Sequence, residues 1–158
     1  MALNTQQLAT LKAAILADPV LDAYPNNSDG AYDMAIFLDQ PATPDFIVWR
    51  TSVPIDDIMR NGMDWARVDN LSVGKARIWD WMSRLGQFDA SRTNVRAGID
   101  ACWVGTAADL AVRTAVYIHC KRSASFAEKV LATGTGTDAV PATMVFEGQV
   151  SLNDLIGL

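Results

Sequence analysis

The sequence predicts a mainly α, single-domain protein of about six or seven helices, with one or two short extended segments and a mobile glycine-rich loop or arm. Three observations predict this class. Apolar residues recur at helical spacing, capping residues precede most of these windows, and glycine or proline follows them. The chain has 158 residues and is 50% hydrophobic, which is enough for one buried core. We therefore expect one helical domain over residues 1–158.

The N-terminal third is expected to form two helices and a strand. Asn4 and Gln7 have the spacing of a capping box, and Asp18–Pro19 ends the helix that follows. A second helix is expected over residues 31–38, before Pro41. The run Phe46–Trp49 is typical of a short strand.

Further helices are expected over residues 54–61, 72–85, 94–104, 107–120 and 125–131, with a last helical turn near 151–154. They begin at Pro, Ser, Asn or Thr, and several end at glycine. Their apolar stripes are expected to be mainly buried through Ile78, Met82, Leu85, Ile99, Cys102, Leu110, Val116 and Leu131.

Residues 133–148 interrupt the helical pattern. The stretch TGTGTDAVPA is small and rich in glycine, so a free chain gains little by packing it. Met144, Val145 and Phe146 are nevertheless three apolar residues in a row. We expect an extended arm that is mobile in a free subunit and becomes ordered against a neighbour through Met144 and Phe146. A solvent-exposed loop without a partner is the alternative.

No residue pattern indicates catalysis, a cofactor or a metal. His119 is the only histidine, which excludes a multi-histidine metal site, and Cys120 points about 100° away from it on a helix. Gly74–Lys75 lacks the other glycine and the hydroxyl residue of a P-loop, and Gly74 is interpreted as a point of close approach. Cys102 and Cys120 are expected to be buried thiols. We therefore expect no enzyme.

Five tryptophans are the unusual feature of the composition. Trp79 and Trp81 lie about 200° apart on a helix, so one face cannot bury both. Either all five tryptophans lie in the core, or at least one lies in an interface. Trp79, Trp81, Arg77 and Arg84 are therefore candidate contact residues, since interfaces favour tryptophan and arginine.

Charge is segregated along the chain. The formal net charge of −5 divides into −5 for residues 1–49, +3 for residues 50–129 and −3 for residues 130–158. The acidic ends are expected to pair with the basic middle of a neighbour in an oligomer, and an uneven solvated surface is the alternative. The candidate bases are Arg50, Arg60, Arg67, Lys75, Arg77, Arg84, Arg92 and Arg96. The acidic total argues against a general nucleic-acid binder.

Several long runs carry a family resemblance: YPNNSDGAYDMA, PDFIVWRTSV, NGMDWARVDNLSVGKARIWDWM, NVRAGIDACWVGTAADLAVRTAVYIHCKR and ATGTGTDAVPATMVFEG. Together they resemble a family of small proteins encoded among the virion assembly genes of tailed bacteriophages. The resemblance covers nearly the whole chain and brings no catalytic motif. It implies a virion structural protein, in the first place a head–tail connector (adaptor) subunit that forms a ring between portal and tail.

The partners implied are copies of the chain and the portal and tail proteins of a particle, with synthesis in the host cytoplasm. Another virion component, in the tail or accessory to the capsid, is an alternative. A further alternative is a DNA-binding regulator with a helix-turn-helix motif over residues 107–120 and 125–132. Basic residues such as Arg113 and Lys129 would then contact phosphates. No sequence-specific nucleic-acid partner is expected. No membrane partner is expected either, because the chain has no apolar run of 18 residues and no secretory signal.

Overall fold

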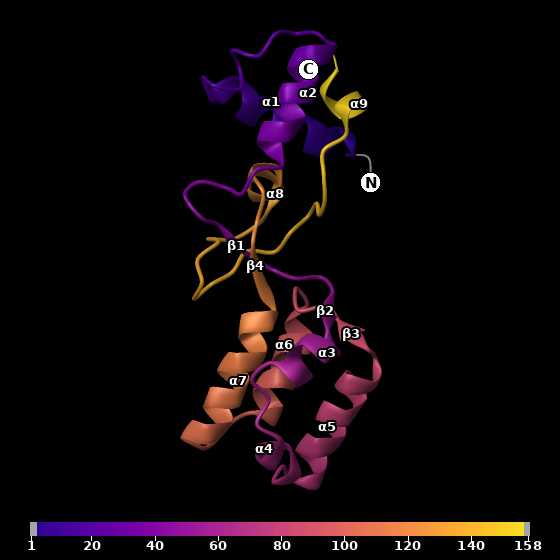
Figure 1. Ribbon diagram of the computed structural model, residues 1–158, viewed down its shortest axis with the longest axis vertical. Helices are drawn as coiled ribbons and strands as arrows, with labels where there is room; N and C mark the ends of the chain where they lie inside the picture. Colours follow the sequence, from indigo (N-terminus) through magenta and orange to yellow (C-terminus); the bar gives the residue numbers. More distant parts are fainter. Residues whose placement is uncertain (1–2, 157–158) are drawn as a thin grey trace. The chain divides into compact units, whose positions relative to one another are not determined.

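The computed structural model describes residues 3–156 and divides into two compact units (Figure 1). Unit 1 contains the residues up to Val48 and those from Ser123 onward, and unit 2 contains Trp49–Arg122. The mainly α class is confirmed, with nine helices and two small two-stranded sheets in the described residues. The chain crosses between the units within β1 (Ile47–Trp49) and β4 (Lys121–Ser123), which pair with each other.

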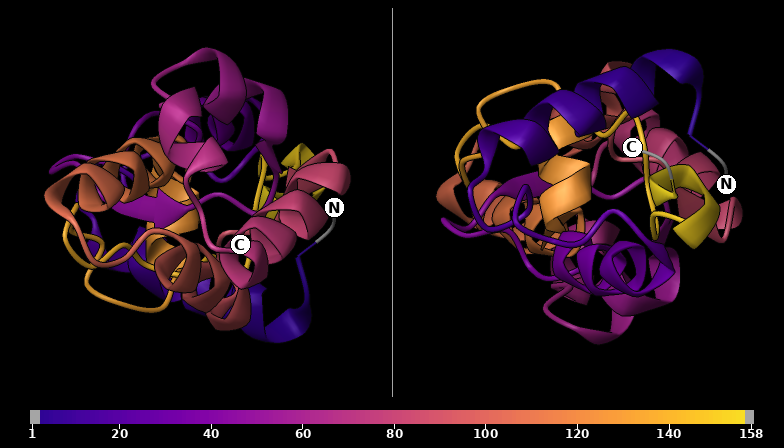
Figure 2. Two further views of the ribbon diagram at one scale, coloured as in Figure 1. Left: turned by 90° about the horizontal axis from the view of Figure 1, so that it is seen from below. Right: turned by 90° about the horizontal axis from the view of Figure 1, so that it is seen from above.

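Unit 1 is built from α1 (Thr5–Ala17), α2 (Ser28–Leu38), α8 (Phe126–Leu131) and α9 (Leu152–Leu155). Helix α8 packs against α1 and α2, and α9 packs against α2; the right-hand view of Figure 2 shows α8 in orange beside α1 in indigo. The side chains that fill the space between them include the fully buried Leu11, Leu21, Leu38 and Phe146.

Unit 2 contains five helices in the described residues: α3 (Ile55–Arg60), α4 (Trp65–Asp69), α5 (Val73–Arg84), α6 (Thr93–Cys102) and α7 (Ala107–His119). A two-stranded antiparallel sheet of β2 (Val53–Pro54) and β3 (Gln87–Phe88) joins them. Helix α5 packs along α6, whereas α3 and α4 pack against α7. The core of the unit gathers Trp79, Trp103, Ile99, Cys102 and Val116.

Local capping chemistry explains where these helices begin. The predicted capping box is confirmed at Asn4–Gln7, and further boxes form at Thr106–Asp109 and Ser125–Glu128. Helix α4 is an additional helix that the sequence pattern did not predict. The Asp64 carboxylate begins it by accepting the backbone N–H groups of Ala66 and Arg67 at 3.0 and 3.3 Å.

The predicted core residues divide into three groups. Ile99, Cys102, Val116 and Leu131 are buried, and Ile78 and Met82 are half-buried. Leu85 is 67% exposed and Leu110 is 39% exposed, so the prediction of burial is wrong for these two. Leu85 caps the C-terminus of α5 on its outer side. Leu110 is displaced from the inner face of α7 because that face runs through Asp109, Val112 and Val116.

Residues 133–148 form an irregular loop within unit 1. Thr133 and Thr143 exchange backbone hydrogen bonds of 2.9 and 2.8 Å across its base. Val145 is 55% exposed and Met144 is half-buried, whereas Phe146 is only 1% exposed. The interpretation of Phe146 as a contact for a neighbouring subunit is therefore wrong, because its ring already belongs to the core of unit 1.

Across residues 3–156, every helix is too short or too polar to cross a membrane.

Candidate interaction surface

The inner face of α5 is held tightly against unit 2. Trp79 is 3% exposed, and its ring meets that of Trp103 with centroids 5.2 Å apart. Gly98 of α6 allows α5 and α6 to approach each other closely, since a Cβ at this position would lie 3.3 Å from the sulfur of Met82 on α5. The Cys102 thiol also donates to the carbonyl oxygen of Lys75 at 3.5 Å. These contacts determine which side of α5 faces solvent.

The outer face of α5 carries a continuous row of exposed side chains. Val73, Arg77, Trp81 and Leu85 follow one another at intervals of four residues, which places them along one side of the helix. We call these four residues the α5 strip. Val73 is 77% exposed, Trp81 62% and Leu85 67%. Single exposed apolar residues are ordinary, but three in one row with a tryptophan at the centre are typical of an interaction surface.

The basic residues of unit 2 are mostly engaged within their own unit. Arginines there form ion pairs with nearby acids, namely Arg50–Asp57, Arg60–Asp56, Arg67–Asp109, Arg84–Asp80, Arg92–Asp89 and Arg113–Asp100. The predicted role of Arg50, Arg60, Arg67, Arg84 and Arg92 as partners for a neighbour's acids is weakened by these contacts. Lys75 donates to the Val104 carbonyl, and Arg96 donates to those of Ala90 and Ser91. Arg77, which lies in the α5 strip, takes part in none of these six ion pairs among the described residues.

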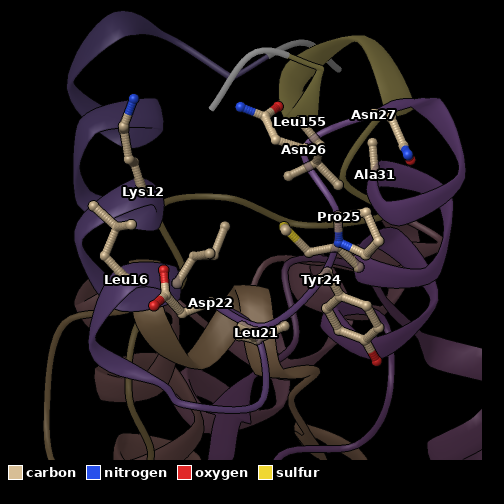
Figure 3. Close-up of a pocket in the computed structure, with 12 residues that line it drawn as sticks. Lys12, Leu16, Leu21, Asp22, Tyr24, Pro25, Asn26, Asn27, Ala31 and Leu155 are labelled. Atoms are coloured by element: carbon tan, nitrogen blue, oxygen red, sulfur yellow. The ribbon is translucent and has the colours of Figure 1, made fainter.

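Unit 1 contains a pocket of about 230 Å³ between α1, α2 and α9 (Figure 3). Its wall combines apolar side chains with polar groups in similar measure, and the polar side chains are those of Lys12, Asp22, Asn26 and Asn27. Figure 3 shows Lys12 and Leu16 on α1 facing Leu155 of α9 across the opening. The apolar lining consists of Ile15, Leu16, Leu21, Tyr24, Pro25, Ala31, Met34 and Leu155.

The size of this pocket indicates what can enter it. Small-molecule sites usually have volumes of roughly 300–1,000 Å³, so about 230 Å³ suits one large side chain better than a cofactor. Leu16, at the opening, is 59% exposed and would be covered by an occupant. A wider and more open hollow of about 660 Å³, also in unit 1, lies over residues 135–138 and Lys129, and Pro44, Phe46 and Ile47 supply the apolar part of its wall.

The residues considered for catalysis all have structural contacts. His119 Nε2 lies 2.9 Å from the carbonyl oxygen of Asn61, and Cys120 is fully buried. Burial raises the pKa of the Cys120 thiol to about 12. In the part of the chain that the structure describes, no three His, Cys, Asp or Glu side chains gather as a metal site would require.

The proposed helix-turn-helix is not supported by the structure. Strand β4 occupies the position where the tight turn would lie, and α7 and α8 belong to different units. Helix α8 also has only six residues, which is short for a recognition helix.

Net charge follows the division into units. Unit 1 contains two basic and ten acidic side chains, a net charge of −8, whereas unit 2 contains eleven basic and eight acidic ones, a net charge of +3. The tertiary structure thus collects the acidic head and tail of the sequence into one unit. Each copy of the protein carries one strongly acidic and one basic unit.

The structure brings together only some of the predicted contact residues. Arg77 and Trp81 share the α5 strip, and Arg84 lies beside it. Trp79 lies in the core, while Met144 and Phe146 belong to unit 1. The pocket was missed by sequence reasoning, although Leu16 beside the buried Ile15 signals a helix with apolar residues on two faces.

Comparisons with protein-family models, with curated proteins and with solved structures find no match to this chain.

Proposed function

We propose that this protein is a structural subunit of a tailed-bacteriophage particle, a head–tail connector (adaptor) that forms a ring between portal and tail. The proposal starts from the resemblance of nearly the whole chain to proteins encoded among phage virion assembly genes. In this role the subunit contacts copies of itself and the portal and tail proteins, after synthesis in the host cytoplasm.

The observation that supports a ring subunit most strongly is the opposite charge of the two units, −8 and +3. When unit 1 of one copy meets unit 2 of the next, opposite charges face each other at every interface. Such a contact is heterologous, because the two copies use different surfaces. Heterologous contacts produce a closed ring when the rotation between neighbours divides a full turn.

Charge and apolar contact have separate roles in such an assembly. Exposed charges steer the encounter and set its register, and they are weakened by salt. A central apolar anchor supplies most of the affinity. The α5 strip provides an anchor of this kind through Val73, Trp81 and Leu85. Assembly is therefore expected to slow at high ionic strength without being abolished.

Mass spectrometry of purified particles of the phage that encodes the chain tests the proposal. We expect the protein in multiple copies per particle, with antibody labelling at the neck between head and tail. Absence of the protein from purified particles would overturn a virion role. Labelling along the tail or over the capsid would assign it to another virion component. Duplex DNA retention by the free protein at moderate salt, combined with absence from particles, would favour the regulator.

A further inference from the structure

We infer that Trp81 of one copy docks into the unit 1 pocket of a second copy, with Arg77 against Asp22 at the pocket's edge. This inference rests on the proposed function, since it identifies the contact that joins neighbouring subunits. The occupant is a second copy of this chain, because the chain itself carries both a pocket and a strip of matching chemistry.

The pocket and the anchor agree in size and polarity. A pocket of about 230 Å³ whose wall combines apolar side chains with polar groups accommodates a single large amphipathic side chain. Tryptophan buries a large apolar area and needs an acceptor for its N–H. The carboxylate of Asp22 and the side-chain amide of Asn26 lie in the pocket wall and offer such acceptors. Exposed Leu16 at the opening provides apolar contact for the aliphatic residues of the α5 strip.

The charges select Trp81 over the other exposed tryptophan. Trp65 is 60% exposed, close to the value for Trp81, so exposure alone does not distinguish them. On α4 the neighbouring base Arg67 already binds Asp109. On α5, Arg77 lies one helical turn from Trp81 and has no ion-pair partner among the described residues. Because unit 1 has a net charge of −8, it favours Trp81, which brings the available Arg77, over Trp65.

The geometry of this contact allows assembly to continue. Each copy offers one α5 strip and one pocket, so a copy that donates Trp81 to one neighbour still receives the Trp81 of another. The contact is thus heterologous, as a ring requires.

Disulfide trapping between two variants of the full-length protein, each with one added cysteine, tests the contact. Arg77→Cys and Asp22→Cys are purified separately, mixed, and treated with a mild oxidant. Peptides that join the two new cysteines are then measured by mass spectrometry. The native Cys102 and Cys120 are fully buried, so they do not compete. The matched control replaces Asp22→Cys with Asp33→Cys, since Asp33 is exposed on α2 but does not line the pocket.

We expect the 77–22 disulfide to exceed the 77–33 disulfide at least about tenfold, and to fall by a similar factor when Arg77→Cys also carries Trp81→Ala. Trp65→Ala should leave the yield within about twofold. Leu16→Arg, a surface change at the opening, should lower the yield as Trp81→Ala does. Equal yields for the two pairs, or no loss with Trp81→Ala, would overturn the inference.

The two proposals fail independently. A protein that is present in particles at the neck, yet shows no preference for the 77–22 disulfide, keeps its connector role and loses this contact. A protein that is absent from particles, yet forms the disulfide preferentially, keeps the self-association and loses the connector role.

Discussion

The indole rings of Trp79 and Trp103 meet edge to face inside unit 2, with an angle of 77° between their planes. Neither indole N–H reaches a hydrogen-bond acceptor among the described residues, so the pair is held by packing and ring contact. This pair anchors α5 to the end of α6 and thereby leaves Trp81 on the outside.

The two tryptophans of α5 should differ in their effect on the stability of a free subunit. Trp79→Ala empties a buried site and should lower the free energy of unfolding by about 3–5 kcal/mol. Trp81→Ala changes an exposed side chain, and its effect should stay within about 0.5 kcal/mol. Urea denaturation of dilute protein, followed by circular dichroism, measures both. Similar losses for the two variants would contradict the assignment of faces on α5.

Two glycines in first helical turns should respond oppositely to replacement by alanine. A Cβ at Gly30 would lie 1.9 Å from the carbonyl oxygen of Pro25, so the backbone must shift. Gly30→Ala should therefore cost about 1–3 kcal/mol. A Cβ at Gly74 meets no atom of the described residues within 4 Å.

Gly74→Ala should raise the free energy of unfolding by about 0.5–1 kcal/mol, because alanine loses less backbone entropy in a helix. The sequence favours Gly74 as a point of close approach, but no described part of the chain itself approaches it. Thermal denaturation of both alanine variants measures the contrast, and a loss of stability for Gly74→Ala would contradict the open surface at the start of α5.

The two cysteines should react slowly in the folded protein. Burial raises the pKa of Cys102 to about 11 and that of Cys120 to about 12, so little thiolate is present at pH 8. Reaction with a chromogenic disulfide reagent should be on the order of 100-fold slower in buffer than in urea. Comparable rates in the two solvents would show that the core of unit 2 opens readily.

The ion pair between Arg67 and Asp109 should make stability depend on pH in the acid range. Hydrogen bonds from the Arg67 guanidinium and from Thr106 lower the pKa of the Asp109 carboxyl to about 2. The unfolded chain has the ordinary aspartate pKa of about 3.9. The contribution of the ionised Asp109 carboxylate to the free energy of unfolding is therefore complete above about pH 4 and is lost as the pH falls toward about 2.

Asp109→Asn should lower the urea midpoint at pH 7, and the difference from the parent protein should narrow at about pH 3. Asp56→Asn is the matched control, because Asp56 forms an exposed ion pair with Arg60 one turn away on α3. Its effect should be small at both pH values. A difference for Asp109→Asn that stays constant from pH 7 to pH 3 would contradict the lowered pKa.

Sequence periodicity and capping predicted most helices because both depend on residues within one or two turns of each other. Asn4 with Gln7 and Ser125 with Glu128 are separated by three positions, so their hydrogen bonds form wherever the chain becomes helical. The 200° separation of Trp79 and Trp81 has the same local origin. The sequence by itself determined that these two side chains point in opposite directions.

Only the tertiary structure decided which of the two tryptophans is buried, because that depends on Gly98 in α6 and on Trp103 directly after it. Unit 1 likewise could not be recognised from the sequence, since its two parts are separated by the whole of unit 2. Its pocket brings Lys12, Asp22 and Leu155 together from α1, a connecting loop and α9. Contacts over such separations arise from packing of the complete chain, and no local pattern of residues specifies them.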